Sequence, residues 1–358
     1  MGTLWTVVDV FQLVDTVRSK GESLTLRSVL RLPVPLRRRF AGPPVSIDGQ
    51  TLDVDMQAIL KLQKIAGIPR VESLPIPAGR ALLRDQSQVV SGHPPVGQTR
   101  DLRVPGPDGG DLPARLYMPR GTVGPSPLLL FIHGGGWVYG DLESHDGVCR
   151  YLAEHAGIRV LAVHYRLAPE HPYPAALEDC YAAYAWLREH AGDVGADPQR
   201  IAVGGDSAGG NLSIAVCLRA REEGLLQPAA QILVYPATDF SQRLPSRAMF
   251  GEGFYLSKEF MDRCEAAYVA PGTDTTDPLL SPLQAKDLSG LAPALVVTAG
   301  FDPLRDEGEA FARRVSDDGG TVVLSRHAGL IHGFFNMVGV STSARRAVDE
   351  VVMRLRDL

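Results

Sequence analysis

The apolar residues of the chain follow two different patterns, which divide it near Pro95. Before that point they recur three to four residues apart, so we predict helices over 4–17, 53–66 and 78–90. Pairs of prolines separate these helices, at Pro33/Pro35, Pro43/Pro44, Pro75/Pro77 and Pro94/Pro95. We therefore expect residues 1–95 to form a mostly helical N-terminal segment.

After Pro95, short apolar runs alternate with helical stretches. Two alternating runs flank the glycine-rich turn 106–110 and predict a hairpin. We predict further strands at 128–132, 160–163, 201–203, 232–235, 295–298 and 322–324, and helices at 175–190, 209–222, 306–315 and 344–355. Continuous apolar strands that alternate with helices indicate a mostly parallel sheet covered on both faces. Residues 241–270 break this rhythm and read as an excursion from the sheet, with a helix after Ser257.

Length and charge narrow the class of protein. A chain of 358 residues suits two domains or one large α/β domain, and its net charge of −5 argues against a nucleic-acid binder. The four cysteines lie far apart with no C-x-x-C pair, so we expect buried reduced thiols and no zinc site. The longest apolar run, 180–187, is far shorter than the roughly 20 residues of a membrane-spanning helix. Asp9 and Asp15 interrupt the apolar N-terminus, which makes a poor secretory signal, and we expect a cytoplasmic protein.

The segment Gly205-Asp206-Ser207-Ala208-Gly209 fits the pattern G-x-S-x-G. Glycine supplies 37 of the 358 residues, so chance gives about 0.2 such matches and the pattern alone is weak. Its context is more specific, because a predicted strand precedes Ser207 and a predicted helix follows it. Glycines on such a turn permit a tight backbone that presents the serine hydroxyl outward. A phosphate-binding helix N-terminus would also suit the glycines, but the lysine of a P-loop is missing.

A second glycine-rich segment, His133-Gly134-Gly135-Gly136, directly follows the predicted strand 128–132. Chance gives only about 0.01 matches to this pattern in a chain of this composition. Three successive glycines after a buried strand let backbone N–H groups approach a ligand that any side chain would obstruct.

A serine nucleophile needs a base to take its proton and an anion to orient that base. The α/β-hydrolase order along the chain is serine, acid, histidine. Asp302 follows the predicted strand 295–298, and His332 follows the strand 322–324, so we expect these two as acid and base. Asp306 and Glu307 are alternatives for the acid, although they lie a turn further along in a predicted helix. His327 is nearer to its strand, but its neighbours suggest a surface position at the strand end.

These motifs together resemble the hormone-sensitive-lipase family of α/β-hydrolase esterases, from about residue 45 to the C-terminus. Five segments carry the resemblance in the family's order: His133-Gly134-Gly135-Gly136-Trp137, Tyr165-Arg166-Leu167-Ala168-Pro169-Glu170, Gly204-Gly205-Asp206-Ser207-Ala208-Gly209-Gly210-Asn211, Asp302-Pro303-Leu304-Arg305-Asp306-Glu307 and Ile331-His332-Gly333-Phe334. The resemblance implies nucleophile Ser207, acid Asp302 and base His332. It also implies an oxyanion hole built from the Ala208 N–H and two amides of the run Gly134, Gly135 and Gly136.

The resemblance further implies an α/β-hydrolase fold with a helical cap. Residues 1–95 would be the N-terminal cap segment, and 96–358 the catalytic domain with a second cap insertion at about 241–270. The chain departs from the family at His164, where members usually carry Asp, which puts the local support of that loop in question. Residues 1–45 exceed the shortest members, and no role is assigned to them. Six residues next to the motifs are candidates for the pocket wall, with plain core packing as the alternative for each: Trp137, Tyr235, Phe254, Phe301, Ile331 and Phe334.

The leading hypothesis is a serine carboxylesterase that cleaves short- to medium-chain esters, with acyl groups of about four to eight carbons preferred as in the resembled family. A lipase or an amidase with the same triad is one alternative. A non-catalytic small-molecule receptor is another, because fold alone does not fix activity. The expected partner is a small-molecule ester. We expect no cofactor, metal, nucleic acid or integral membrane segment, while a homodimer and peripheral membrane contact stay open.

Overall fold

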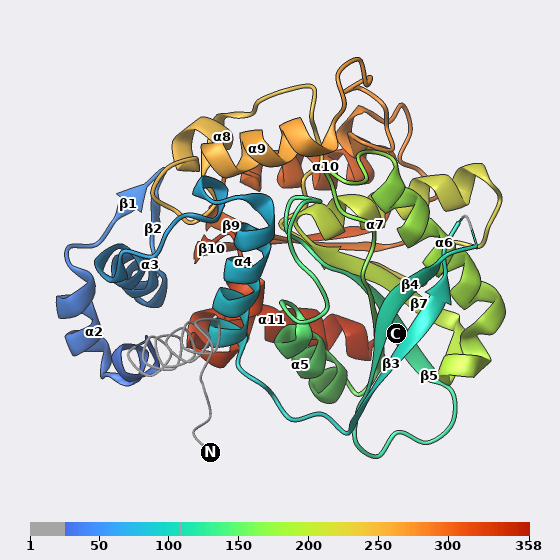
Figure 1. Cartoon of the computed structure of the whole chain (residues 1–358), viewed down its shortest axis with the longest axis horizontal. Coiled ribbons are helices and arrows are strands. Elements are labelled where there is room, and N and C mark those ends of the chain that lie inside the picture. Colours follow the sequence, from blue (N-terminus) through green and yellow to red (C-terminus); the bar gives the residue numbers. More distant parts are fainter. Residues whose placement is uncertain (1–25, 108) are drawn as a thin grey trace, which may run out of the picture.

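A computed structural model describes residues 26–107 and 109–358 (Figure 1). The helix predicted over 4–17 lies outside these described residues. The other two N-terminal helices are present as α3 (Val54–Ala66) and α4 (Ile76–Ser91). The Asp53 side chain caps α3 by accepting the Asp55 N–H at 2.8 Å, and Gly67 ends it with a φ of 59°.

Prolines open helices in this region as well as separating them. The helix α2 (Val34–Ala41) is absent from the predicted elements, because the pair Pro33/Pro35 predicts only a break between helices. Pro35 lies in the first turn of α2 and Pro77 in the first turn of α4. A proline costs little there, since the first N–H groups of a helix have no intrahelical partner. A short hairpin, β1 (Ser46–Ile47) with β2 (Gln50–Thr51), joins α2 to α3.

An eight-stranded, mostly parallel sheet forms the centre of the molecule. Its strand order is β10-β9-β8-β7-β5-β6-β4-β3. The predicted hairpin is β3 paired with β4, and both the β3–β4 and the β4–β6 pairs are antiparallel, while the other neighbours are parallel. The strands are β3 (Gln98–Pro105), β4 (Asp111–Met118), β5 (Ser126–Ile132), β6 (Arg159–Val163), β7 (Ala196–Asp206), β8 (Gln231–Val234), β9 (Ala294–Phe301) and β10 (Val322–Ile331).

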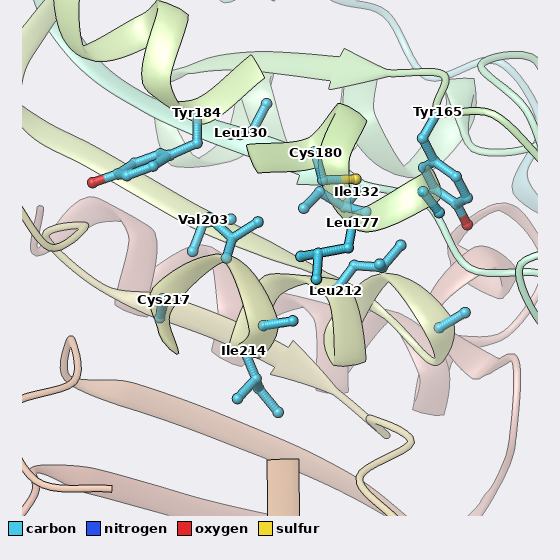
Figure 2. Packing of buried hydrophobic residues seen from close by; sticks show 14 of the residues in the cluster. Leu130, Ile132, Tyr165, Leu177, Cys180, Tyr184, Val203, Leu212, Ile214 and Cys217 are labelled. Atoms are coloured by element: carbon cyan, nitrogen blue, oxygen red, sulfur yellow. The ribbon is translucent and has the colours of Figure 1, made fainter. Parts of the chain in front are cut away.

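Helices cover both faces of this sheet, as predicted. Along β5, Leu128, Leu130 and Ile132 belong to one buried apolar cluster, whereas Leu129 and Phe131 belong to another. The first cluster contains α6 (Ala175–His190), α7 (Ala208–Glu222) and α10 (Arg305–Asp317), and Figure 2 shows part of it around Leu130 and Ile132. The second contains α5 (Asp146–Ala156) and α11 (Thr342–Arg356).

The excursion after β8 contains two helices, α8 (Pro245–Phe250) and α9 (Lys258–Tyr268). Ser257 caps α9, as its side chain accepts the Phe260 N–H at 3.0 Å. The same hydroxyl donates to Glu72, and the guanidinium of Arg263 donates to the Glu72 carbonyl at 2.6 Å. These contacts tie the excursion to the segment between α3 and α4. The remaining short 3₁₀ helices are η1 (Val71–Ser73), η2 (Ala191–Val194), η3 (Pro282–Gln284) and η4 (Phe334–Gly339).

Candidate active site

Ser207 occupies the turn between β7, which ends at Asp206, and α7, which begins at Ala208. Its φ of 56° and ψ of −115° are unusual for a residue with a side chain and mark stored backbone strain. Gly205 and Gly209 make this turn sterically possible, because a Cβ at either position would come within 1.9 Å of the Ile132 carbonyl oxygen. The turn therefore holds the Ser207 hydroxyl at the carboxyl end of the sheet.

The structure brings Ser207, His332 and Asp302 together from the ends of three strands. His332 Nε2 lies 3.1 Å from Ser207 Oγ, and His332 Nδ1 lies 2.8 Å from Asp302 Oδ2. Asp302 is fully buried, and its other carboxylate oxygen, Oδ1, accepts the Leu304 N–H at 2.8 Å. The carboxylate is thus fixed by the chain that follows β9, and it is oriented toward the imidazole.

The other acid and base candidates have different partners. Asp306 accepts the Ser246 N–H at 2.9 Å and a guanidinium hydrogen bond from Arg305 at 2.8 Å. Glu307 accepts the Thr238 N–H at 2.8 Å and belongs to a buried cluster with Arg247. His327 Nε2 lies 3.1 Å from Glu350, further back along β10. None of these interactions involves Ser207 or His332.

A second histidine-bearing loop, 133–136, passes beside Ser207 after β5. The Gly134 N–H donates to Asp206 Oδ1 at 2.9 Å. Gly134 was a candidate oxyanion donor, and this is a correction: its only N–H is already bound to a carboxylate. In the described part of the chain, the N–H groups of Gly135 and Gly136 have no partner, and the Ala208 N–H lies in the first turn of α7. The N–H groups of Gly135, Gly136 and Ala208 are therefore the ones available to a ligand beside Ser207.

Glycine is required at Gly135 for two separate reasons. Its φ is +118°, a value that L side chains rarely adopt, and an added Cβ would come 2.3 Å from the Tyr139 carbonyl oxygen. The neighbouring Gly136 has a φ of +61° and has no room for a side chain either, because a Cβ there would come 2.5 Å from Cys264 Sγ. The loop conformation that exposes these two N–H groups depends on both glycines.

His133 anchors this loop through a network of neutral groups. Its Nδ1 lies 2.9 Å from the Gly134 carbonyl oxygen, which can only accept, so Nδ1 carries the proton. The Nε2 atom of the neutral ring then accepts from His164 Nδ1 at 3.2 Å. Tyr165 stacks on the His133 ring and its hydroxyl donates to the His133 carbonyl oxygen at 2.9 Å. Burial and then the neighbouring His164 and His145 lower the pKa of His133 to about 3, so the ring stays neutral.

Asp206 and His145 are functional neighbours that the sequence analysis left without a role. His145 is buried, and its Nε2 lies 3.2 Å from Asp206 Oδ1. Burial alone raises the pKa of Asp206, but His145 and the Gly134 N–H outweigh it, and the pKa lies below its usual value. The G-x-S-x-G pattern leaves position 206 unspecified, so only the pairing of β5 with β7 brings this carboxylate to the glycine loop.

Two cavities share Ser207 in their walls. The larger has a volume of about 520 Å³ and lies among α3, α4, the loop 253–257 and the His332 loop. The smaller has a volume of about 30 Å³ and is lined mainly by α9 and by residues such as Trp137, Phe240 and Leu304. Four residues line both cavities: Gly136, Ser207, Leu256 and Phe260.

Most of the residues predicted for the pocket wall line neither of these cavities. Trp137 lines the small one, but Tyr235, Phe254, Phe301, Ile331 and Phe334 do not contribute to either. Tyr235 instead packs against the His332 ring, with centroids 4.4 Å apart, and Phe334 meets Tyr235 edge-on. Phe254 and Phe301 pack together with Phe250. Tyr235, Phe301, Ile331 and Phe334 thus belong to the buried apolar core behind the site, and the half-buried Phe254 packs against that core.

Among residues 26–107 and 109–358, no helix combines the length and the apolar character that crossing a bilayer requires. Within the same residues, no group of three or more His, Cys, Asp or Glu side chains is arranged to hold a metal ion.

Comparison with known proteins agrees with this geometry. A sequence model of the alpha/beta hydrolase fold family matches residues 129–336. The chain is 46% identical over 333 residues to the carboxylic ester hydrolase LipN of Mycobacterium tuberculosis, which covers 91% of this chain and 88% of that protein. It is 37% identical over 316 residues to the ethyl acetate hydrolase of Pseudomonas putida, covering 86% of this chain and 99% of that one.

A solved structure has the same fold. The ester-hydrolase EH1AB1 from the metagenome of Lake Arreo, complexed with a derivative of bipyridine phosphonate, superposes with a TM-score of 0.82 at 42% identity. The match covers 86% of this chain and 98% of that one. The chain therefore belongs to the α/β-hydrolase fold family and is a carboxylic ester hydrolase of the hormone-sensitive-lipase type.

Proposed function

We propose that the enzyme cleaves carboxylic esters through a covalent acyl intermediate on Ser207. The observation that carries the proposal is the hydrogen-bonded chain from Ser207 Oγ through His332 to Asp302, with distances of 3.1 and 2.8 Å. Ser207 Oγ attacks the ester carbonyl carbon while His332 Nε2 takes the hydroxyl proton. Asp302 orients the imidazole and stabilises its positive charge.

The attack forms a tetrahedral intermediate, which breaks down with His332 again carrying the proton. His332 gives its proton to the ester oxygen, the alcohol leaves, and the acyl group stays bound to Ser207. A water molecule next gives a proton to His332 and attacks the acyl carbon, and His332 returns the proton to Ser207 as the acid leaves. The N–H groups of Gly135, Gly136 and Ala208 supply the donors for the negative oxygen in both tetrahedral intermediates.

We also propose that residues 1–95 and about 241–270 act as a cap over the catalytic domain, 96–358. Support comes from the walls of the large cavity, where Ile59 and Leu83 come from α3 and α4, and Phe260 comes from α9. These walls are separated in sequence from Ser207 and His332, which lie at the sheet. A cavity of about 520 Å³ suits a small ester better than a lipid droplet surface.

We also propose the class of substrate and the location of the enzyme in the cell. A short- to medium-chain ester is the substrate, in preference to an emulsified triglyceride or an amide. A cytoplasmic location fits the four cysteines, which are all buried and unpaired: Cys149, Cys180, Cys217 and Cys264.

Active-site labelling tests this proposal directly. A p-nitrophenyl alkylphosphonate presents a tetrahedral phosphorus, which Ser207 Oγ attacks with loss of p-nitrophenol. We expect one p-nitrophenol per chain, abolished hydrolysis of p-nitrophenyl butyrate, and the added mass on the peptide that contains Ser207. Labelling of another residue, or full activity after stoichiometric labelling, would refute Ser207 as the nucleophile. An anilide and emulsified tributyrin, assayed beside the butyrate, separate the amidase and lipase alternatives.

A further inference from the structure

The two cavities at Ser207 differ in size and in their relation to the base. Both are lined by Gly136 and Ser207, so the ester carbonyl carbon and its oxyanion lie where the cavities meet. His332 lines the large cavity and is absent from the walls of the small one. This asymmetry bears on which half of an ester enters which cavity.

Proton transfer determines the orientation of the ester. The alcohol oxygen must come within hydrogen-bond distance of His332 Nε2, because that atom protonates the leaving group. The alcohol half therefore points toward the cavity that His332 lines, and the acyl half is left with the small one. The order of events agrees with this orientation: departure of the alcohol empties the large cavity, and water can then approach His332 while the acyl group remains in the small cavity.

From this asymmetry we propose that the enzyme is selective for esters of short acids, such as acetate and propionate, with longer alcohols. The inference rests on the proposed function and names its substrate class. It departs from the expectation, drawn from the family resemblance, that acyl groups of four to eight carbons are preferred.

The walls of the small cavity set the limit on the acyl group. Its volume of about 30 Å³ holds about two water-sized groups, which corresponds to a methyl or ethyl substituent. Trp137 is held by stacking on Tyr268, with ring centroids 4.7 Å apart. Arg247 and Glu265 also line this cavity and form an ion pair at 2.6 Å, in which both side chains are mostly buried. A longer acyl chain would have to displace packed rings or separate this pair, and both changes are costly.

The walls of the large cavity suit an extended apolar alcohol. Apolar side chains of α3 and α4 line it, among them Ile59, Leu60, Leu83 and Val90. Each methylene that leaves water for such a wall adds to binding, so longer alcohols gain until the cavity is filled.

Two isomeric esters test the proposal without changing overall hydrophobicity. Hexyl acetate and ethyl hexanoate have the same formula and both release a primary alcohol, but the long chain lies on opposite sides of the ester bond. We expect kcat/KM to be at least about tenfold higher for hexyl acetate, the scale of discrimination that a closed apolar pocket provides. Equal rates, or a preference for ethyl hexanoate, would overturn the proposal.

Matched variants locate the effect. Met261→Ala and Leu83→Ala each remove three heavy atoms, from the small and the large cavity respectively. Met261→Ala should raise the ratio of ethyl hexanoate to hexyl acetate cleavage about tenfold, and Leu83→Ala should not. The opposite pattern would assign the acyl group to the large cavity. Loss of hydrolysis of both isomers in the wild-type chain, or labelling away from Ser207, would instead refute the proposed function itself.

Discussion

Two histidines on the loops around Ser207, His332 and His133, are held in opposite electrostatic surroundings. On the loop after β10, His332 lies 2.8 Å from the fully buried carboxylate of Asp302. On the loop after β5, His133 lies 3.2 Å from another imidazole, His164, and has no carboxylate at hydrogen-bond distance within the described residues.

This difference matches what each ring has to do. In the proposed reaction His332 becomes a cation during each half, so a buried anion beside it stabilises that state. His133 keeps one proton on Nδ1 and fixes the glycine loop, and a charge there would be buried without a counterion. At position 164, where the resembled family usually carries Asp, the imidazole donates to His133 Nε2. A carboxylate there could only accept a hydrogen bond, and so would need a protonated Nε2.

The largest expected effect comes from replacing Ser207, the proposed nucleophile, which lies between the loops after β5 and β10. Ser207→Ala should lower kcat for p-nitrophenyl butyrate on the order of 10⁶-fold, because loss of a triad nucleophile leaves only binding and the oxyanion donors. The side chain is small and partly exposed, so the melting temperature should stay near that of the wild type. A folded variant that kept more than about a hundredth of the wild-type rate would contradict the assignment.

The next largest effect distinguishes Asp302 from Asp306 as the acid that orients His332. Asp302→Asn should lower kcat roughly 10⁴-fold, because an amide at this position favours the wrong imidazole tautomer. Asp306→Asn is the matched control: its carboxylate binds Ser246 and Arg305, and activity should fall much less. The measurement is kcat of both purified variants, compared with that of the wild type. A larger loss in Asp306→Asn than in Asp302→Asn would transfer the role of the acid.

A third test addresses the loop that His133 holds. Gly135→Ala should lower kcat about 10²- to 10³-fold, the cost of losing one oxyanion donor, since the new Cβ collides with the Tyr139 carbonyl. Gly192→Ala is the control, because a Cβ there meets nothing within 4 Å and its φ lies outside the positive region. If Gly135→Ala retained full activity, this loop would not supply the oxyanion donors.

The smallest effect concerns stability and the neutral histidine. His133 has a folded-state pKa of about 3 against about 6.5 in the unfolded chain, so protons bind more tightly to the unfolded state. The contribution of neutral His133 to the free energy of unfolding is complete above pH 6.5 and is lost as the pH falls toward 3. Between pH 6.5 and 5 this amounts to about 2 kcal/mol of the free energy of unfolding, measured by urea denaturation.

The variant His164→Asp sharpens that measurement. A carboxylate beside His133 favours its charged form and raises its folded-state pKa, so stability should fall less steeply between pH 6.5 and 5. Equal slopes for the wild type and the variant would show that the His133–His164 pair does not govern the acid sensitivity of the fold.

The sequence predicted most of the sheet, because the buried strands are continuous apolar runs and each is followed by a helix or a turn. The predicted helix 175–190 has the same bounds as α6. Helix α5 was not predicted, although Val148, Cys149 and Leu152 are spaced as on a buried helical face. Its first turn contains Gly147, whose absent side chain lets Ser91 pack close, and such a contact is not visible in the chain itself.

The site was predictable as far as motifs define it. Ser207, Asp302 and His332 follow strands whose carboxyl ends meet, so their proximity could be expected. The pocket walls could not, because they come from α3, α4 and α9, which have no sequence relation to the motifs. The Gly134–Asp206 hydrogen bond likewise depends on strand pairing between distant segments.

The partition between the two cavities has a consequence for how such enzymes diversify. Leu256 and Phe260 belong to the segment that leaves the sheet after β8 and rejoins it at β9, whereas the proposed nucleophile, acid and base follow strands of the sheet itself. Recombination that exchanged this one segment between related chains would therefore change the preferences for acid and for alcohol together, and would carry none of the three proposed catalytic residues with it. Libraries shuffled at the two block ends should consequently yield active progeny with new substrate ranges more often than libraries with crossovers inside the sheet.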